Sequence, residues 1–470
     1  MSDYDLVVLG SGPAGEKGAA QAAYYGKRVA VVEREPHVGG SAINTGTIPS
    51  KTLRETALYF SGLRQRGLYG IDYSLREGLT VKDFMYREHV VVDQQRETIR
   101  HNLERHKIEI VWGSGTIVDP QTVRVQTSDG GTRDLSTAFI LIATGSSPYH
   151  PPAVPFDGIR IYDSDSILNM QFIPKSMAVI GGGVIGSEYA SVFTALGVQV
   201  TLVESRDRLL PAIDHEIARR LQAQLEQMGL RFVFGDRVMS IEVSTDHVHL
   251  ELENSGRLEC DIALFAAGRQ SNIEGLGLEA LGVALGPRGL IVVNEHYQTN
   301  VPTIYAAGDV IGFPALASTS MEQARVAVVH AFNLHYKEHL SPVLPYAIYT
   351  VPEIAMAGLT EEECAEKGIA YLVGRAEYAQ NPRGQIIGET HGMLKLIFSP
   401  ADKKLLGVHH LGELSSELVH IGAHALFDGA TIDEFIMAVY NYPTLSDAYK
   451  YAAYDGLGAW ERWRTAAVAP

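Results

Sequence analysis

Short apolar runs that end in glycine divide the N-terminal part of the chain into segments. The runs Leu6–Leu9, Phe139–Ala143, Met177–Ile180 and Ile262–Ala267 each lead into glycine, which is typical of buried strands entering tight turns. Residues 51–106 have few glycines and a helical pattern. The alternation of strand and helix predicts an α/β fold with parallel sheets.

Two glycine motifs occur in the same register, 171 positions apart, from position 10 to position 181. The first comprises Gly10, Gly12, Gly15 and Glu33, and the second comprises Gly181, Gly183, Gly186 and Glu204, with the acid 18 residues after the last glycine in both copies. Such glycines allow a tight turn, close approach of a pyrophosphate and close packing of helix on strand, while the acid accepts hydrogen bonds from a ribose. The repeat therefore predicts two Rossmann-like domains that each bind a dinucleotide. The alternative, ordinary turns in βαβ units, is less favoured for a repeated motif than for a single copy.

Composition narrows the class of protein. A chain of 470 residues is long enough for about three domains. The net charge of −16, without a basic run, disfavours nucleic acid as a partner. No apolar run approaches the ~20 residues of a membrane span. Cys260 and Cys364 fit no metal or disulfide spacing, so we expect no metal site and a cytoplasmic location.

A proline-rich linker and a change in the pattern of strands and helices predict the domain boundaries. We expect residues 1–150 to form the first dinucleotide-binding domain, completed by residues 270–345, and residues 151–269 to form the second. A proline-rich linker precedes the second domain. Residues 346–470 change to short strands interleaved with helices, such as Met393–Phe398, which predicts a C-terminal α+β domain.

Six motifs together resemble one known family. They are Gly10–Gly15, the segment from Gly39 to Lys51, Ala143–Gly145, the second glycine motif (Gly181–Gly186), Tyr305–Asp309 and Tyr442–Thr444. The chain resembles the flavoprotein disulfide reductases with two dinucleotide sites, which include lipoamide dehydrogenase, glutathione reductase and the soluble pyridine nucleotide transhydrogenases. The resemblance implies FAD on the first motif, NAD or NADP on the second, and a homodimer or higher homo-oligomer formed through the C-terminal domain.

The resemblance also implies which residues contact FAD. Asp309 would hold the ribityl or phosphate region, and the helix opening at Leu316–Ala317 would stabilise negative charge on the flavin. The full expected set is Gly10, Gly12, Gly15, Glu33, Gly40, Ala42, Lys51, Gly115, Thr144, Gly145, Asp309, Leu316 and Ala317. Lys51 and Glu188 match the pair of opposite charges that the family places beside the flavin, although Lys51 alone could be a solvated helix residue.

The chain lacks the residues that the family uses for thiol chemistry. The two cysteine positions before Ile48–Lys51 are Ala42 and Thr47, so no dithiol can form there. The histidine of the C-terminal His-Pro motif is Tyr442. With a pKa near ~10, tyrosine is poorly suited to proton relay at neutral pH. Tyr442 could equally be an interface aromatic.

A flavin without a dithiol must pass its electrons directly to an acceptor. The segments Thr47–Lys51 and Tyr442–Thr444 are most similar to the transhydrogenase members, which implies ping-pong hydride transfer from NADPH through flavin N5 to NAD⁺. Three alternatives stay open: a quinone or dye reductase, a non-catalytic flavin-binding protein and, least favoured, a true disulfide reductase.

The second site must then accept both NAD(H) and NADP(H). Glu204 can accept from a free ribose hydroxyl, whereas Arg206 and Arg208 can pair with a 2′-phosphate. These three charged residues could instead form a solvated cluster. The expected nucleotide site comprises Gly181, Gly183, Gly186, Glu204, Arg206, Arg208 and Gly268.

Overall fold

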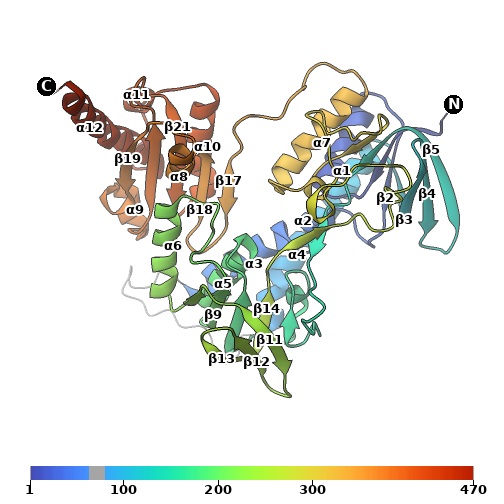
Figure 1. The fold of residues 1–470 in the computed structure, drawn as a ribbon, viewed down its shortest axis with the longest axis horizontal. Helices are drawn as coiled ribbons and strands as arrows, with labels where there is room; N and C mark the ends of the chain where they lie inside the picture. Colours follow the sequence, from blue (N-terminus) through green and yellow to red (C-terminus); the bar gives the residue numbers. More distant parts are fainter. Residues whose placement is uncertain (1, 63–79, 469–470) are drawn as a thin grey trace.

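The computed structural model describes residues 2–62 and 80–468. Figure 1 shows three groups of elements: the N-terminal sheet with its helices, the green central sheet and the orange-to-red C-terminal elements. The predicted α/β architecture with a C-terminal α+β domain is confirmed. Residues 63–79 of the stretch expected to be helical lie outside the described residues.

The first sheet has the strand order β1-β2-β3-β4-β5-β16, with an additional β1–β5 pairing. Its parallel core joins β1, β2, β3, β5 and β16, whereas β4 pairs antiparallel with β3 and β5. The strands are β1 (Tyr4–Leu9), β2 (Val29–Glu33), β3 (Glu109–Asp119), β4 (Thr122–Thr127), β5 (Thr132–Ile142) and β16 (Ile304–Ala306). Because β16 lies far along the chain, the first sheet needs a segment from beyond the second glycine motif.

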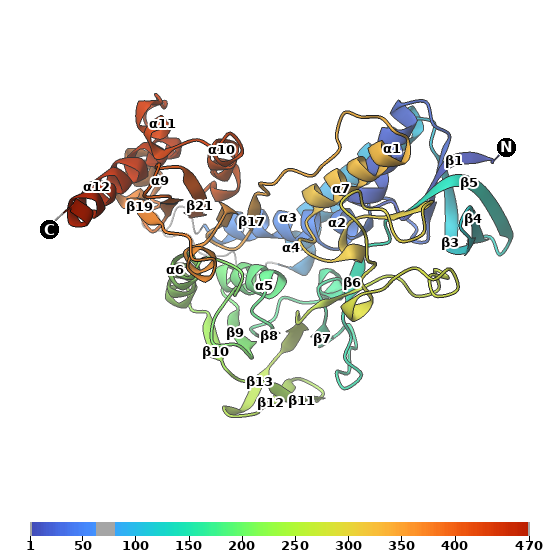
Figure 2. The same cartoon turned by 45° about the horizontal axis from the view of Figure 1, so that its top comes forward.

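Helices α1 (Pro13–Tyr24) and α7 (Ala317–Ala331) lie side by side against the first sheet (Figure 2). Small buried residues such as Ala19 and Ala324 let them approach closely. On the way to the second sheet the chain forms α2 (Gly40–Asn44), α3 (Thr47–Ser61) and α4 (Val81–Arg105). Helix α4 begins at a capping box in which Thr80 and Asp83 satisfy each other's backbone N–H groups.

The second sheet has the parallel order β10-β9-β8-β14-β7. A separate antiparallel sheet, β11-β12-β13, packs beside it. The elements are β7 (Ile161–Tyr162), β8 (Ser176–Ile180), α5 (Val184–Ala195), β9 (Gln199–Glu204), α6 (His215–Gln227), β10 (Arg231–Phe234), β11 (Val238–Val243), β12 (Val248–Leu252), β13 (Gly256–Cys260) and β14 (Ile262–Phe265). The chain passes between the first and second sheets twice. The two connecting segments contain the strands β6 (Ser146–Pro148) and β15 (Arg269–Ser271), which pair antiparallel.

The C-terminal elements surround an antiparallel sheet of order β17-β18-β21-β20-β19. Helix α10 packs against the central strands, and α12 packs against the β19 edge. The elements are β17 (Tyr346–Ile348), β18 (Ile354–Gly358), α8 (Glu361–Glu366), β19 (Leu372–Glu377), α9 (Pro382–Ile387), β20 (Met393–Phe398), β21 (Leu405–Leu411), α10 (Ser415–Phe427), α11 (Ile432–Met437) and α12 (Ala448–Val468). Short 3-10 helices are η1 (Ser166–Asn169), η2 (Pro287–Gly289), η3 (Asp309–Ile311), η4 (Tyr378–Gln380) and η5 (Leu445–Asp447).

One hydrophobic core crosses all three groups of elements. It contains Leu53 of α3, Phe84 of α4, Phe193 of α5 and Ile348 of β17. Burial of such side chains stabilises the fold by roughly 1.5–3 kcal/mol each. Because α3 and α5 meet β17 in this core, they are held together where the expected Lys51–Glu188 pair lies.

Candidate active site

The first and third glycines of each motif are required by the protein itself. Gly10 and Gly181 have positive φ values of 96° and 109°, which side chains other than glycine rarely adopt. A Cβ atom on Gly15 would lie 1.8 Å from the Gly10 carbonyl oxygen, and one on Gly186 would lie 1.9 Å from that of Gly181. These four glycines therefore keep the turn tight and the helix close to its strand.

Neither backbone conformation nor packing requires the middle glycine of either motif. Gly12 and Gly183 have φ values of −66° and −78°. Beyond its chain neighbours and its own helix backbone, a Cβ on Gly183 would meet no atom of the described residues within 4 Å, and one on Gly12 would meet only the Gly40 Cα, at 3.8 Å. Both positions leave space that the protein does not fill, as a closely approaching ligand requires.

These open glycines lie at helix N-termini. Gly12 and Gly183 are the N-caps of α1 and α5, and neither helix has a side-chain cap. The first N–H groups of both helices therefore need partners, and a pyrophosphate would provide them. A cavity of about 650 Å³ borders Pro13, Gly39 and Ile43 next to the first loop. The residues present fit two dinucleotides, one at each loop.

The two motif acids tie the glycine loops to their strands. Glu33 accepts from the Ser11 N–H at 2.9 Å and from the Glu35 N–H at 2.9 Å. Glu204 accepts in the same way from the Gly182 N–H at 2.6 Å and the Arg206 N–H at 2.9 Å. Each buried carboxylate thus supports its loop in addition to the ribose contact that the sequence predicts.

The two arginines after Glu204 have different environments. The Arg206 side chain is exposed, and only its backbone N–H reaches Glu204. Arg208 Nη2 donates to the Pro211 carbonyl at 2.7 Å, while its Nη1 is buried without a hydrogen-bond partner among the residues described. A solvated cluster does not describe Arg208, because its guanidinium is held in the loop.

Lys51 and Glu188 form the ion pair expected from the sequence. Lys51 Nζ lies 2.8 and 2.7 Å from the two oxygens of Glu188, although α3 and α5 supply them from 137 positions apart. Glu188 is buried and Lys51 is partly exposed. The pair therefore presents a fixed positive charge on the accessible side.

Tyr349, which no sequence motif indicates, contacts both members of this pair. Its backbone N–H donates to Glu188 Oε1 at 2.9 Å, and its ring centroid lies 4.9 Å from Lys51 Nζ. The residue comes from the turn after β17, 161 positions beyond Glu188. A backbone donor leaves no mark in the side-chain pattern, so only the fold reveals it.

Positions 42 and 47, which the resemblance assigns to the family's cysteine pair, are alanine and threonine. Ala42 lies within α2, and Thr47 is the exposed first residue of α3. The two cysteines of the chain are buried elsewhere. Burial raises the pKa of the Cys260 thiol to about 12 and also raises the pKa of Cys364, so neither is a thiolate at neutral pH.

The remaining expected FAD residues gather at the crossing between the sheets. Ser146 Oγ donates to Asp309 Oδ2 at 2.7 Å and accepts from Arg269 Nε at 2.8 Å. Thr144 Oγ1 donates to the Asn272 carbonyl at 2.7 Å. Gly145, and Gly268 of the expected nucleotide set, adopt positive φ. Helix α7 begins at Ala317 with Leu316 as its N-cap, as the family resemblance implies.

Two expected residues have other environments. Gly115 lies within β3, where a Cβ would approach Leu9 Cδ2 to 2.8 Å, so core packing requires this glycine. Its expected contact with FAD stays a prediction, and packing against Leu9 is a second reason for a glycine at this position. Tyr442 is 72% exposed on the C-terminal domain, and no contact joins it to Lys51 or Glu188 of the same chain among the residues described.

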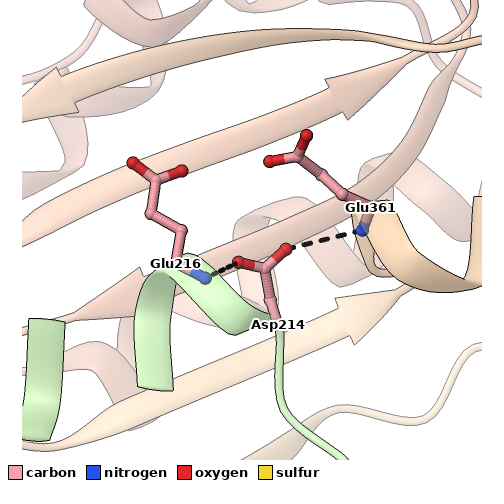
Figure 3. Close-up of side chains that lie close together, drawn as sticks. All are labelled: Asp214, Glu216 and Glu361. Carbon is pink, nitrogen blue, oxygen red and sulfur yellow. Dashed lines mark hydrogen bonds between the residues drawn. The ribbon is translucent and has the colours of Figure 1, made fainter. Parts of the chain in front are cut away.

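A second charged cluster lies between α6 and the C-terminal domain. Oxygens of Asp214, Glu216 and Glu361 lie within 4.8 Å of one another, a spacing that could hold a metal ion (Figure 3). The Lys395 ammonium contacts all three carboxylates and supplies positive charge. Burial alone would lower the pKa of Lys395, but Asp214 and Glu361 outweigh burial and raise it. The cluster therefore joins two domains as an ion network.

No helix within residues 2–62 and 80–468 is long and apolar enough to cross a bilayer.

Comparisons with known proteins agree with this geometry. The family model for pyridine nucleotide-disulphide oxidoreductases matches residues 4–331, and the model of that family's dimerisation domain matches residues 344–453. The chain is 43% identical to a soluble pyridine nucleotide transhydrogenase of Mycobacterium bovis over 97% of both chains. It is 39% identical to one of Erwinia tasmaniensis, covering 97% of this chain and 98% of the relative.

Solved structures extend the likeness to the fold. LpdA from Mycobacterium tuberculosis superposes with a TM-score of 0.89 at 27% identity, covering 96% of this chain and 99% of that one. The HOCl-induced flavoprotein disulfide reductase RclA from Escherichia coli gives a TM-score of 0.85 at 28% identity, covering 95% and 98%. Together with the two glycine loops, these matches show that the chain belongs to the pyridine nucleotide-disulphide oxidoreductase family.

Proposed function

We propose that this protein is a FAD-dependent soluble pyridine nucleotide transhydrogenase that transfers a hydride between NADPH and NAD⁺. The observation that carries the proposal is the intact Lys51–Glu188 pair in a chain whose thiol positions are Ala42 and Thr47. Relatives that bear this name align over 97% of the chain. The chain works as a homodimer through its matched dimerisation domain, and we expect it in the cytoplasm.

The first glycine loop holds FAD. Gly12 leaves room for the pyrophosphate, the N–H groups at the start of α1 bind it, and Glu33 accepts from the ribose. Asp309 would hold the ribityl or phosphate region of FAD, and the N-terminus of α7 would stabilise negative charge on the flavin. When bound, FAD supplies the chemistry that accepts a hydride from one nicotinamide and returns it to another.

The second glycine loop holds both nucleotides in turn. Gly183 leaves room for the pyrophosphate at the start of α5, and Glu204 accepts from the adenosine ribose of NAD(H). Arg206 and the partnerless Nη1 of Arg208 bind the 2′-phosphate of NADP(H). Because donor and acceptor use one site, the first product must leave before the second substrate enters.

Lys51 and Glu188 act beside the nicotinamide and flavin rings. The Lys51 ammonium would stabilise negative charge on a bound flavin, and Glu188 holds Lys51 in place through both of its carboxylate oxygens. Tyr442 has no proton to move in this scheme, since a hydride exchanged between two nicotinamides requires no general acid.

A two-step stopped-flow experiment tests the proposal. NADPH is expected to bleach the bound flavin, and a spectrally distinct NAD⁺ analogue is expected to restore its colour and become reduced. Steady-state rates should give parallel lines in double-reciprocal plots. If NADPH bleaches the flavin but only quinones or dyes restore it, the protein is a reductase of those acceptors and the transhydrogenase assignment is wrong.

A further inference from the structure

The turn between β17 and β18, residues 349–353, connects the C-terminal domain to the two helices that carry Lys51 and Glu188. It makes four polar contacts with them. They are Tyr349 N–H to Glu188 Oε1 at 2.9 Å, Arg54 Nε to the Thr350 carbonyl at 2.8 Å, Val351 N–H to Ser191 Oγ at 3.2 Å, and Arg54 Nη1 to Glu353 Oε1 at 3.2 Å. The 349–353 turn therefore touches α3 and α5 at once.

The spacing of these contacts follows the helix repeat. Lys51 and Arg54 are three residues apart on α3, as are Glu188 and Ser191 on α5. Residues at this spacing share one helix face. The faces that present the ion pair are therefore the same faces that bind the 349–353 turn.

The contacts are shielded from water. Arg54 is 2% exposed, and Ser191 and Thr350 are fully buried. A buried guanidinium or amide that loses its hydrogen-bond partner destabilises the folded state. The turn therefore has one favourable position against the two helices. A shift of the turn would break several buried bonds together.

Tyr349 is the member of the turn that reaches the ion pair itself. Its N–H shares Glu188 Oε1 with Lys51 Nζ, which fixes the plane of the carboxylate. Its ring lies within cation–π distance of the ammonium, at 4.9 Å. Lys51 is thus restrained both by the carboxylate and by an aromatic ring from the C-terminal domain.

We infer that Tyr349 is a positioning residue for Lys51 and Glu188, and that the 349–353 turn gives the C-terminal domain control over hydride transfer within its own chain. This inference rests on the proposed function in one respect: it takes Lys51 to act beside the flavin. The matched dimerisation domain would then have a second task, because it sets the geometry of the redox site in addition to joining two copies.

Two matched pairs of variants of the full-length, FAD-loaded protein test the inference. Tyr349→Leu removes the aromatic ring, whereas Tyr349→Phe keeps it. Ser191→Ala removes the acceptor for Val351, whereas Thr194→Val removes a buried hydroxyl on the same helix that donates only to the Ala190 carbonyl. Both hydroxyls make a backbone bond within α5, at 2.7 Å in each case, so the pair differs in the contact with the turn.

The readouts are the midpoint potential of the flavin and the rate of its reduction at saturating NADPH. With Lys51 less well placed, we expect Tyr349→Leu and Ser191→Ala to shift the potential to more negative values and to slow saturated reduction about fivefold, the scale of one cation–π contact. The KM for NADPH should hardly change. Tyr349→Phe and Thr194→Val should resemble the wild-type protein.

The outcomes separate this inference from the proposed function. If Tyr349→Leu and Tyr349→Phe give the same potential and the same reduction rate, Tyr349 does not position the pair. If the wild-type flavin is reduced but transfers nothing to NAD⁺, the transhydrogenase proposal fails, while the comparison of potentials still decides the role of Tyr349. Thermal unfolding of each variant identifies a loss that comes only from reduced stability.

Discussion

The ammonium of Lys395, fully buried, lies 2.8 Å from both carboxylate oxygens of Asp214. Asp214 also caps α6 by accepting from the N–H groups of Glu216 and Ile217. One buried ion pair therefore joins the start of a helix in the nucleotide-binding region to strand β20 of the C-terminal domain.

Replacing Lys395 by methionine should destabilise the protein by about 3–5 kcal/mol, because it leaves buried carboxylates without their counter-charge. Arg124→Met is the control, since the Arg124–Asp134 pair is exposed and such pairs contribute only about 0–1 kcal/mol. Urea unfolding of both variants measures the difference. Equal, small losses would show that the buried network does not hold the two domains together.

Asp214 should make stability depend on pH in acid. Burial opposes its ionisation, but His409 and Lys395 outweigh burial and hold the pKa of Asp214 below its usual value. The stabilisation is therefore complete above the unfolded pKa of ~3.9 and is lost as pH falls through the lower folded value. Unfolding free energies of wild type and Asp214→Asn should converge below about pH 4. A difference that stays constant down to about pH 2 would exclude this role.

Substituting Gly12 should impair the binding of FAD, and substituting Gly183 should impair the binding of the pyridine nucleotide. Gly12→Val should abolish FAD binding, and Gly183→Val should abolish reduction by NADPH while the protein stays yellow, because each side chain enters the space left for a pyrophosphate. Absorbance spectra and nucleotide titrations measure both effects. Retention of FAD by Gly12→Val would contradict the placement of the cofactor.

Glu204 at the end of β9 and Arg206 just beyond it should affect the binding of NAD(H) and NADP(H) differently. Arg206→Ala should weaken NADP(H) by about 1–3 kcal/mol, the range for a charge-assisted hydrogen bond, and leave NAD(H) nearly unchanged. Glu204→Ala should weaken both nucleotides, because Glu204 also holds the Gly182 and Arg206 N–H groups of the loop. Dissociation constants for all four nucleotides test this. Equal losses for NAD(H) and NADP(H) in Arg206→Ala would place dual specificity elsewhere.

Thiol reagents should leave the activity intact. Cys260 is buried, and burial raises its pKa to about 12, while Ala42 and Thr47 cannot react. Reduction by NADPH should therefore consume two electrons per flavin and stop. Inactivation by iodoacetamide, or efficient turnover of glutathione disulfide, would show that a thiol takes part after all.

The dinucleotide loops could be predicted from the sequence because their geometry is local. The turn, the helix start and the acid at the end of the next strand lie within one βαβ unit, so spacing alone predicts their relative positions. The sequence could not separate the glycines required by packing from those that leave space, since that depends on neighbours such as Ala143 and Gly40. Gly115 shows the same limit, because its neighbours Leu9 and Val32 come from other strands.

By itself, the sequence determined the two nucleotide loops, because the turn, the helix start and the acid of each loop lie within one short stretch of consecutive residues. The tertiary structure decided what surrounds Lys51. Residue type and family resemblance indicated Glu188, but the Tyr349 amide reaches the pair only because the chain returns through the C-terminal domain. Lys395 and Asp214, 181 positions apart, likewise meet only where α6 packs against β21. Such contacts follow from packing between distant segments, and backbone donors carry no residue identity from which a sequence pattern could predict them.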